Sequence, residues 1–475
     1  MAARFRVSRL AALVAFSAVA VPVPAAVAAA EAPPAAAPAA VSFAAAVSQA
    51  LVNNASVIAA RHAWASAKRD AEKARGFSLP SLSFEERFVR TNVPAEAFAL
   101  KMNEERLLAS DFADVDNFNK PAPINDFVTS FTLEQPLFAP KAWLGYRMAG
   151  REAEAAGLDA ARTREETVHR VLSAYVGART AKEFVRVAGQ GVSDAREHLR
   201  IAEALERAGM GLVSDTLRAR VFVARAESGL VAARNRLAVA QTALGLAMGE
   251  AAGTRVDAAE PVPPLPDPGS LEGRIAALAA NRSDLKAFSA RIANAETNVT
   301  YERADYLPTV GATGAWQIDA GDGPFSPDNR TWKVGVGLKW NLFDGLRREA
   351  AVGKAAEERG RAKANYRGAS DEAAFEVTRA YLSVEAASRR LEIAGAALAA
   401  AEEGARLVKA RYENQRARMI DVLDAQSALD AARADHASAE NDVVASRAEL
   451  EYASGTLLSW AVPGETAAAA GRADR

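Results

Sequence analysis

The chain has 475 residues, a formal net charge of −1 and no cysteine. The balanced charge provides no global field that favours nucleic acid or acidic substrates. The lack of cysteine excludes disulfides, thiolate metal sites, a cysteine nucleophile and a cysteine-linked lipid anchor, and the four histidines are too scattered to suggest a metal centre.

The N-terminus has the pattern of a secretory signal peptide over residues 1–30. Three arginines within the first nine residues precede an apolar core at 10–21, and an A-x-A motif stands at 26–28. The core is too short for the alternative, an anchor helix. Residues 31–40 are rich in proline and alanine and predict a linker. No later stretch is apolar enough for a spanning helix, so any membrane span of the exported protein must use strands.

The next segment predicts a helix followed by two strands. The helix covers about 42–75, and alternating apolar residues predict strands over about 81–90 and 127–138. Glu86 interrupts the apolar side of the first strand. The intervening residues 91–126 are polar, with several Pro, Asn and Asp, and predict a long irregular loop.

A long helix is predicted over about 140–208, beginning at a proline that suits the first turn. It carries two rows of small and aliphatic residues that repeat every seven positions, which is typical of a coiled-coil seam. The sequence Gly209-Met210-Gly211 breaks it, and a second helix follows. Residues 260–270 are rich in proline and form a predicted linker.

The whole pattern then repeats. A helix over 271–304 precedes strands at about 309–318 and 332–343 and a long helix over about 345–413. A break near 414–418 leads into a last helix. We interpret this as an internal duplication, with repeats at 41–259 and 271–457 and a flexible tail at 458–475. Matching positions include Leu137-Phe138 with Leu342-Phe343, Ala174-Tyr175 with Ala380-Tyr381, and Asp215 with Asp421.

The last predicted strand has the features of a membrane-spanning strand. Apolar residues alternate with glycine, lysine and asparagine, and a tryptophan stands near each end. The expected membrane-interface aromatics are Trp316, Trp332 and Trp340. Four spanning strands cannot close a barrel, so either the strands are not in lipid or two or three chains share one barrel. Composition alone does not choose between two and three.

Several motifs together resemble the TolC-like outer-membrane efflux proteins. They are the signal peptide, the duplicated strand–long helix–break–helix pattern, Leu-Pro before each hairpin, QPLF and NLFDG at the strand-to-helix junctions, and DVLDAQSALDAA after the last break. The resemblance covers about residues 41–457. It implies a mainly α fold with a small β-barrel part, in which a homotrimer forms a twelve-stranded barrel in the outer membrane of a Gram-negative-type cell. A long α-helical tunnel continues it into the periplasm.

The resemblance also implies function and partners. The protein would be the passive exit duct of a tripartite efflux or type I secretion system, without catalysis or a cofactor. Its partners would be a periplasmic adaptor, an inner-membrane transporter and outer-membrane lipid, and no nucleic acid. The alternatives are a secreted enzyme, for which no convergent set of reactive groups appears, and a soluble periplasmic coiled-coil adaptor, which would lack aromatic-flanked strands.

Site residues follow from the same resemblance. An acidic aperture at the periplasmic end corresponds to Asp421 and Asp424, and to Asp215 in the first repeat, where Arg218 replaces the second acid. The expected gate and tip contacts are Tyr412, Arg416, Arg418, Gly209 and Gly211.

Two points leave the tip assignment open. The family usually has glycine six residues before the aspartate, which Gly209 matches and Gln415 does not. Asp421 and Asp424 also suit the first turn of a helix, where acidic side chains are favourable, so helix capping is the alternative to an aperture.

Overall fold

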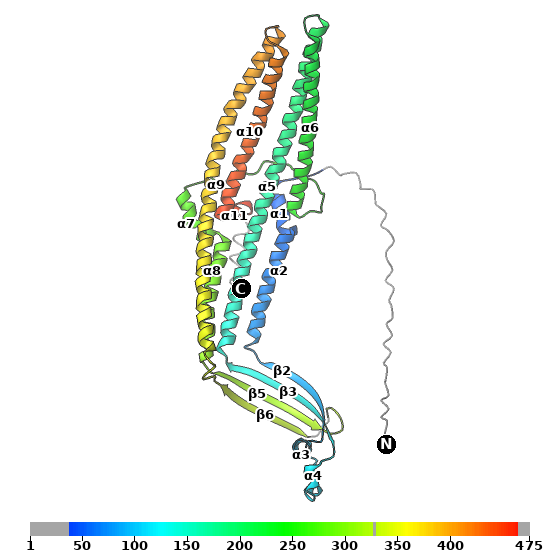
Figure 1. Cartoon of the computed structure of the whole chain (residues 1–475), viewed down its shortest axis with the longest axis vertical. Helices are drawn as coiled ribbons and strands as arrows, with labels where there is room; N and C mark the ends of the chain where they lie inside the picture. Colours follow the sequence, from blue (N-terminus) through cyan, green and yellow to red (C-terminus); the bar gives the residue numbers. More distant parts are fainter. Residues whose placement is uncertain (1–37, 326–328, 464–475) are drawn as a thin grey trace, which may run out of the picture. The chain divides into compact units, whose positions relative to one another are not determined.

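The computed structural model describes residues 38–325 and 329–463 (Figure 1). The predicted signal peptide and residues 31–37 of the predicted linker lie outside the described residues. The same holds for residues 464–475 of the predicted tail.

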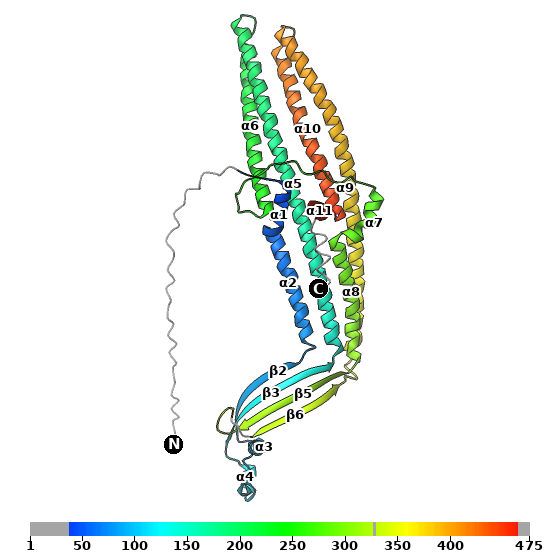
Figure 2. The ribbon, with the colours of Figure 1, turned by 180° about the vertical axis from the view of Figure 1, so that it is seen from behind.

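Four helical columns run side by side (Figures 1 and 2). Two columns are the single long helices α5 (Pro140–Arg207) and α9 (Arg347–Glu413). Each of the other two is built from shorter helices that follow one another along a long helix, α2 then α6 beside α5, and α8 then α10 beside α9. Their bounds are Ala55–Gly76, Val213–Met248, Ser283–Arg303 and Met419–Ser454.

The predicted seven-residue rows pack where the columns meet. Ala373, Val377, Ala380 and Val384 of α9 are buried at alternating spacings of four and three residues. Alanine on one row lets the neighbouring helix approach closely, while valine on the other fills the gap. The heptad pattern therefore predicts the buried face of this stretch correctly.

Two predicted helices are each divided in the structure. The segment 42–75 forms α1 (Phe43–Asn53) and α2, and 271–304 forms α7 (Leu271–Asn281) and α8, followed by the short η2 (Ala304–Tyr306). Asn54 and Arg282 take extended backbone conformations at the two breaks. The Asn54 side chain accepts the Ser56 N–H at 2.9 Å and so begins α2.

The break in the first helix lets α1 join a central core halfway along the columns. There β1 (Ala39–Val41) pairs in parallel with β4 (Val256–Ala258), two short strands that the sequence patterns did not predict. The Tyr175 hydroxyl of α5 donates to Glu260 O at 2.8 Å and lies 3.2 Å from Val41 O. The predicted linker 31–40 therefore ends in an ordered strand.

The predicted tail is also partly ordered. Residues Leu457–Ala461 form α11, and the Trp460 ring lies 5.5 Å from the Phe43 ring of α1. Burying these apolar side chains against the core explains why the segment is helical. The expectation of a flexible tail from residue 458 was wrong for residues 458–461.

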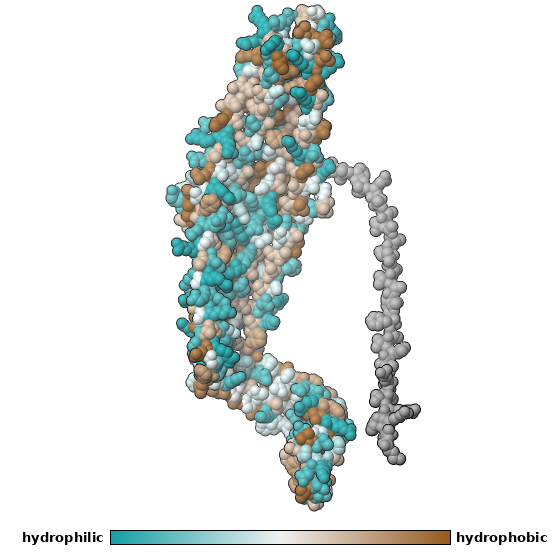
Figure 3. Space-filling view, viewed as in Figure 1, coloured by the Kyte–Doolittle hydropathy of each residue, from teal (hydrophilic) through white to brown (hydrophobic). Residues whose placement is uncertain are grey.

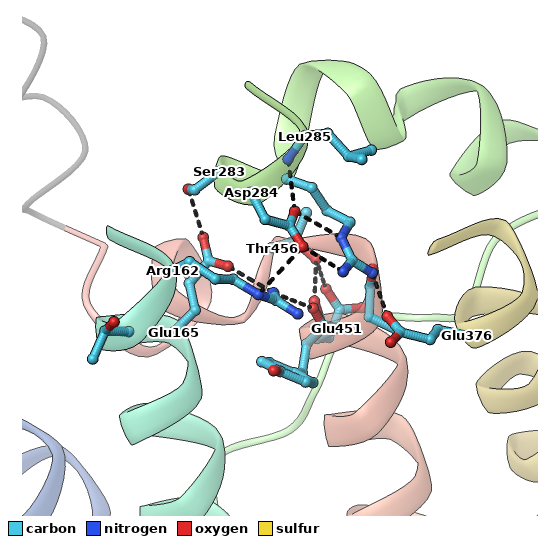
Figure 4. Close-up of polar contacts among 12 residues, drawn as sticks. Arg162, Glu165, Ser283, Asp284, Leu285, Glu376, Glu451 and Thr456 are labelled. Carbon is cyan, nitrogen blue, oxygen red and sulfur yellow. Dashed lines mark hydrogen bonds and ion pairs between the residues drawn. The ribbon is translucent and has the colours of Figure 1, made fainter. Parts of the chain in front are cut away.

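Buried ion pairs fasten the columns together beside the α7–α8 break (Figure 4). The Arg282 guanidinium pairs with Asp284 at 2.6 Å and with Glu376 of α9. On α5, Arg162 pairs with Glu165 at 3.0 Å and lies 3.7 Å from Asp284. Side chains of α5, α8 and α9 therefore stabilise the backbone at this break.

One antiparallel four-stranded sheet lies at the end of the long helices opposite their breaks, in the order β2-β3-β5-β6 (Figure 1). Its strands are Ser81–Thr91, Ile124–Phe138, Thr309–Ala320 and Arg330–Lys339. The middle pair, β3 and β5, joins the two repeats. Within this chain, β2 and β6 each have one edge without a partner strand.

The last strand ends earlier than predicted. β6 stops at Lys339, whereas the pattern extended the strand to 343. The Arg348 guanidinium accounts for this, because it donates to Asn341 O and Leu342 O, each at 2.9 Å. The Trp340 ring N–H donates to Tyr306 O at 3.1 Å. Trp340 therefore belongs to the strand-to-helix junction rather than to the strand.

The segment 91–126 is not an irregular loop. It contains α3 (Pro94–Asn103), the 3₁₀ helix η1 (Ala109–Phe112) and α4 (Asp116–Asn119), and β3 begins at Ile124. The rings of three phenylalanines from these elements pack within 6.1 Å of one another. Proline and asparagine at the helix ends led to the wrong prediction, because such residues are common in loops and in helix caps alike.

Among the described helices, none by itself has the length and hydropathy of a membrane span. The pair α1 and α2 meets both criteria only when taken together across a 46° bend.

Candidate functional site at the hairpin tips and on the sheet

The first helical hairpin turns at Gly209, between α5 and α6. The Gly209 N–H donates to Glu206 O and the Met210 N–H to Leu205 O, each at 2.9 Å, which closes the helix end as a Schellman motif. The φ of Gly209 is +73°, a left-handed value that glycine adopts without a side-chain clash. At Gly211 a Cβ would lie 2.9 Å from the Glu206 nitrogen, so the turn leaves no room there for a side chain.

The second hairpin turns in the same way at Gln415, between α9 and α10. The Gln415 N–H donates to Tyr412 O at 2.8 Å and the Arg416 N–H to Arg411 O at 2.7 Å. Gln415 has φ +58°. Replacing the usual glycine by glutamine therefore keeps the turn and places a side chain in a left-handed conformation, which is unfavourable for L-residues.

The two carboxylates of the second tip have different surroundings. Asp421 accepts the Arg418 N–H at 2.9 Å and its guanidinium at 3.2 Å. The backbone hydrogen bond, followed by the side-chain bond, lowers the pKa of Asp421. Asp424 is exposed and, within the described residues, forms no hydrogen bond or ion pair. Capping therefore accounts for Asp421, whereas Asp424 has no such explanation.

Asp215 and Tyr412 lie close together although they come from different repeats. Tyr412 is 7% exposed and packs in an apolar cluster with Met419 and with Ala219 of the first hairpin. Burial, and after it the negative charge of Asp215, raises the pKa of Tyr412. Arg218, which takes the place of the second acid, lies 4.0 Å from the Asp215 carboxylate. The structure thus joins the two tips around Tyr412.

The arginines of the second tip are both exposed. Arg418 pairs with Asp421, and Arg416 forms no ion pair with any residue that the structure describes. Large apolar side chains are exposed at the first tip, and Figure 3 shows hydrophobic residues among hydrophilic ones at this end of the helices. They are Met210, Leu212, Val213 and Leu217.

A buried polar network between α5 and α10 was missed by the sequence analysis. His198 of α5 contacts the Gln426 side-chain oxygen at 3.2 Å, and the Gln426 amide donates to Asp194 at 3.1 Å. Arg433 of α10 pairs with Asp194 at 3.0 Å. These residues are far apart in the sequence, and no local pattern indicated that they meet.

The two faces of the sheet differ in polarity. Residues that are paired across the strands share a face, so the register assigns each side chain to one of two surfaces. One surface is apolar and exposed, and it includes Phe84, Phe88, Phe131, Leu133, Trp316, Trp332, Val334, Val336 and Leu338. The opposite surface is polar, and it includes Ser83, Glu85, Arg87, Ser130, Thr132, Glu134, Gln317, Thr331, Lys333 and Lys339.

The register explains the tryptophans and the exception at Glu86. Trp316 and Trp332 are directly opposite each other on the apolar surface. Glu86 lies on the same surface, where its carboxylate accepts the Thr129 hydroxyl at 2.6 Å. The interruption of the first strand pattern is therefore a hydrogen-bonded pair rather than a break in the strand.

No group of three or more His, Asp or Glu side chains in residues 38–325 and 329–463 is arranged to hold a metal ion.

A family model decides the classification. The model described as outer membrane efflux protein matches residues 46–250 and 275–456, which include both hairpins and all four strands of the sheet. The chain belongs to the outer membrane efflux protein family. One matched segment lies in each of the two predicted repeats.

Relatives and solved structures agree with this family. The chain is 26% identical over 301 residues to the outer membrane efflux protein BepC of Brucella suis, covering 62% of this chain and 64% of BepC. It is 23% identical to the alkaline protease secretion protein AprF of Pseudomonas aeruginosa, covering 72% of each chain.

Its fold matches the outer membrane protein VceC of Vibrio cholerae with a TM-score of 0.72 and 18% identity, over 87% of this chain and 96% of VceC. It matches the MtrE outer membrane channel of Neisseria gonorrhoeae with a TM-score of 0.71 and 18% identity, over 87% and 89%. The outer membrane efflux family and this fold belong to channel proteins rather than enzymes, and the soluble adaptor interpretation is not supported.

Proposed function

We propose that three copies of this outer membrane efflux protein share one twelve-stranded barrel in the outer membrane. The observation that carries this proposal is the four-stranded sheet, which is apolar on one surface, polar on the other and unpaired at both edges. In lipid an unpaired edge is costly, because its N–H and C=O groups have no water to bind. Pairing β6 of one copy with β2 of the next removes every edge, with the polar surface facing the lumen.

The helical columns continue this barrel as a tunnel in the periplasm. The sheet lies at one end of α5 and α9 and the hairpin tips at the other, so a barrel in the outer membrane directs the tips inward (Figure 1). The connections that follow β2 and β5 begin at the end of the sheet away from the helices, and that end faces the cell exterior in this arrangement. The tunnel and the barrel form one path from the periplasm to the outside.

The protein acts as the passive exit duct of a tripartite efflux or type I secretion system. The similarity to BepC, an outer membrane efflux protein, and to AprF, an alkaline protease secretion protein, supports these two settings. The exposed apolar residues of the first tip and the basic second tip are surfaces for a periplasmic adaptor, which connects the duct to an inner-membrane transporter. Outer-membrane lipid surrounds the apolar surface of the barrel.

The periplasmic tips form a closed, acidic aperture. Asp215, Asp421 and Asp424 lie at the starts of α6 and α10, beside the turns of the two hairpins. Threefold repetition gathers these carboxylates near one axis, where like charges repel by about 1 kcal/mol per pair at 4 Å in water and by more at a lower dielectric constant. Arg418 offsets part of this charge through Asp421. Asp424, without such a partner, is the carboxylate best suited to attract cations.

Native mass spectrometry of the detergent-extracted protein tests the assembly. We expect a trimer, and extraction from the membrane fraction should require detergent. A monomer or dimer as the dominant folded species contradicts the shared barrel. Co-purification with an inner-membrane transporter and an adaptor from cross-linked cells tests the exit-duct function separately.

A further inference from the structure

The segment between β2 and β3 is a small folded unit, which we call the outer lid (residues 92–123). Its helix α3 packs against β3. The rings of Phe98, Phe112 and Phe118 pack together with centroids 5.3 to 6.1 Å apart, and Lys101 pairs with Asp111 at 3.0 Å. A segment with its own aromatic cluster and ion pair holds a defined shape, as an unstructured loop does not.

The outer lid packs against the polar surface of the sheet. Three residues of β3 face that surface, namely Ile124, Asp126 and Val128. Asp319 of β5 is paired with Val128 and faces the same surface. All four are buried, although the rest of this surface is largely open. The shorter connection in the second repeat takes the other side, because the Phe325 ring stacks on Phe84 at 6.0 Å on the apolar surface. Phe325 and the outer lid therefore lie on opposite surfaces of the sheet.

The outer lid covers carboxylates that lie close together. Asp126 is 0% exposed, and its carboxylate makes no hydrogen bond of ordinary geometry, although the Ala320 N–H lies near enough to favour the charged form. The Glu104 Oε1 atom is also buried without a hydrogen-bond partner. Asp319 and Glu104 both lie close enough to repel the Asp126 carboxylate, and Arg87 is the cation that acts on it. Arg106 pairs with Glu104 at 2.6 Å and is half exposed. Buried carboxylates that are only partly compensated weaken an interface, so this contact favours a lid that is able to separate from the sheet.

The outer lid exposes three large apolar side chains among charged ones. Leu108, Phe112 and Val115 are 60% to 71% exposed, on a segment that faces water in the proposed orientation. Large apolar side chains that are exposed on one short segment suit contact with another apolar surface. In a threefold barrel, the other occupant of the same mouth is the outer lid of a neighbouring copy.

We propose that three outer lids meet through Leu108, Phe112 and Val115 and close the outer mouth of the channel. This inference rests on the proposed trimer. Twelve strands spaced about 4.8 Å apart and tilted by about 40° enclose a barrel about 24 Å across. Three helices of about 10 Å diameter around one axis span about 22 Å, so three outer lids, each with at least one helix, are wide enough together to block the lumen.

Cysteine cross-linking in the full-length protein tests the contact, because the chain has no cysteine of its own. Val115→Cys should form subunit dimers with a short thiol-reactive cross-linker. Val334→Cys, on the apolar surface that points away from the axis, serves as the matched control and should not. A trimer in native mass spectrometry with no cross-link at Val115→Cys and Leu108→Cys overturns the proposal. Absence of a trimer instead contradicts the proposed function.

Conductance in planar bilayers tests the closure. Replacing residues 94–121 by a short Gly/Ser turn should raise the single-channel conductance severalfold. Asp126→Asn removes a negative charge from the contact between the outer lid and the sheet. Because this strengthens the contact, the variant should lower the open probability of the full-length channel. If both variants form trimers that conduct like the parent, the outer lid does not close the mouth.

Discussion

The side-chain amide of Gln415 donates to the Met210 sulfur at 3.2 Å, and this contact joins the tips of the two hairpins. The two residues belong to equivalent turns of the two repeats. The side chain that distinguishes the second turn from a glycine turn therefore reaches the first turn. A left-handed backbone at Gln415 accompanies this contact.

Gln415→Gly is expected to relieve backbone strain and to separate the tips. Removing a side chain from a left-handed position should contribute about 1 kcal/mol of stability to the turn. Met210→Leu is the matched control, because it removes the sulfur and leaves Gln415 in place. Both variants should be measured for thermal unfolding, which reports stability, and for conductance in planar bilayers. Higher conductance in both variants, with greater stability only for Gln415→Gly, is the expected result. An unchanged conductance in both would show that the contact does not restrain the tips.

Asp421 and Asp424 are expected to differ when they are changed separately. Asp424→Ala should weaken cation selectivity and divalent block from the periplasmic side without destabilising α10, because its carboxylate has no partner within the described chain. Asp421→Ala should also destabilise the start of α10, whereas Asp421→Asn keeps a capping side chain. Planar-bilayer reversal potentials and block by divalent ions provide the readouts. A double alanine variant that is trimeric and blocked like the parent would contradict the aperture.

The two surfaces of β6 are expected to respond differently to a lysine. Val336→Lys places a charge on the apolar surface and should cost about 2–4 kcal/mol near the bilayer midplane. Gly337→Lys places it on the polar surface, where a new Cβ meets no atom within 4 Å, and it should alter ion selectivity with little effect on stability. Resistance of the trimer to heat in detergent measures the difference. Equal losses in the two variants would show that the surfaces are assigned incorrectly.

Two carboxylates of the buried ion-pair network are expected to respond to pH with opposite signs. Burial raises the pKa of Glu165, although Arg162 and Ser283 act against the rise. The folded state then holds its proton more tightly than the unfolded state, so stability falls as pH rises through the folded pKa. Glu165→Gln should therefore gain stability relative to the parent as pH rises from acid to neutral.

Asp284 provides the matched control in the same network. Its pKa is lowered because hydrogen bonds and charge from Arg282 outweigh the effect of burial. The ionised Asp284 carboxylate stabilises the fold at a pH above its unfolded-state pKa, and this contribution is lost as pH falls. Asp284→Asn should therefore be destabilised most, relative to the parent, at neutral pH. Thermal unfolding across the pH range measures both variants. The same direction of change in both would contradict this account.

The outer lid is expected to be accessible from outside intact cells. A peptide tag inserted beside Asn117, in α4, should bind an antibody without permeabilisation, because the lid lies at the end of the sheet opposite the helices (Figure 1). A tag at Gly209, at the hairpin tip, is the control and should need a broken outer membrane. Labelling of the Asn117 tag only after permeabilisation would reverse the proposed orientation.

Local patterns in the sequence were sufficient for the repeat, the long helices and the strands. Heptad rows identify α5 and α9 because every turn of a coiled coil imposes the same spacing, and alternation identifies the strands because every second side chain faces the same way. The resemblance placed Asp215, Asp421, Asp424 and Tyr412 at the tips. The break at Gly209 was also predicted from the sequence, and glycine permits the left-handed backbone that the structure has there.

Only the tertiary structure decided where these patterns stop and what they contact. The breaks at Asn54 and Arg282 depend on a side-chain cap and on ion pairs from other helices, which no local pattern contains. β6 ends at Lys339 because Arg348 takes the next carbonyl groups. The outer lid is ordered by contacts among its own rings and with β3, so its polar composition alone predicted a loop. Long-range contacts of this kind outweigh local preference wherever the chain packs against a distant segment of itself.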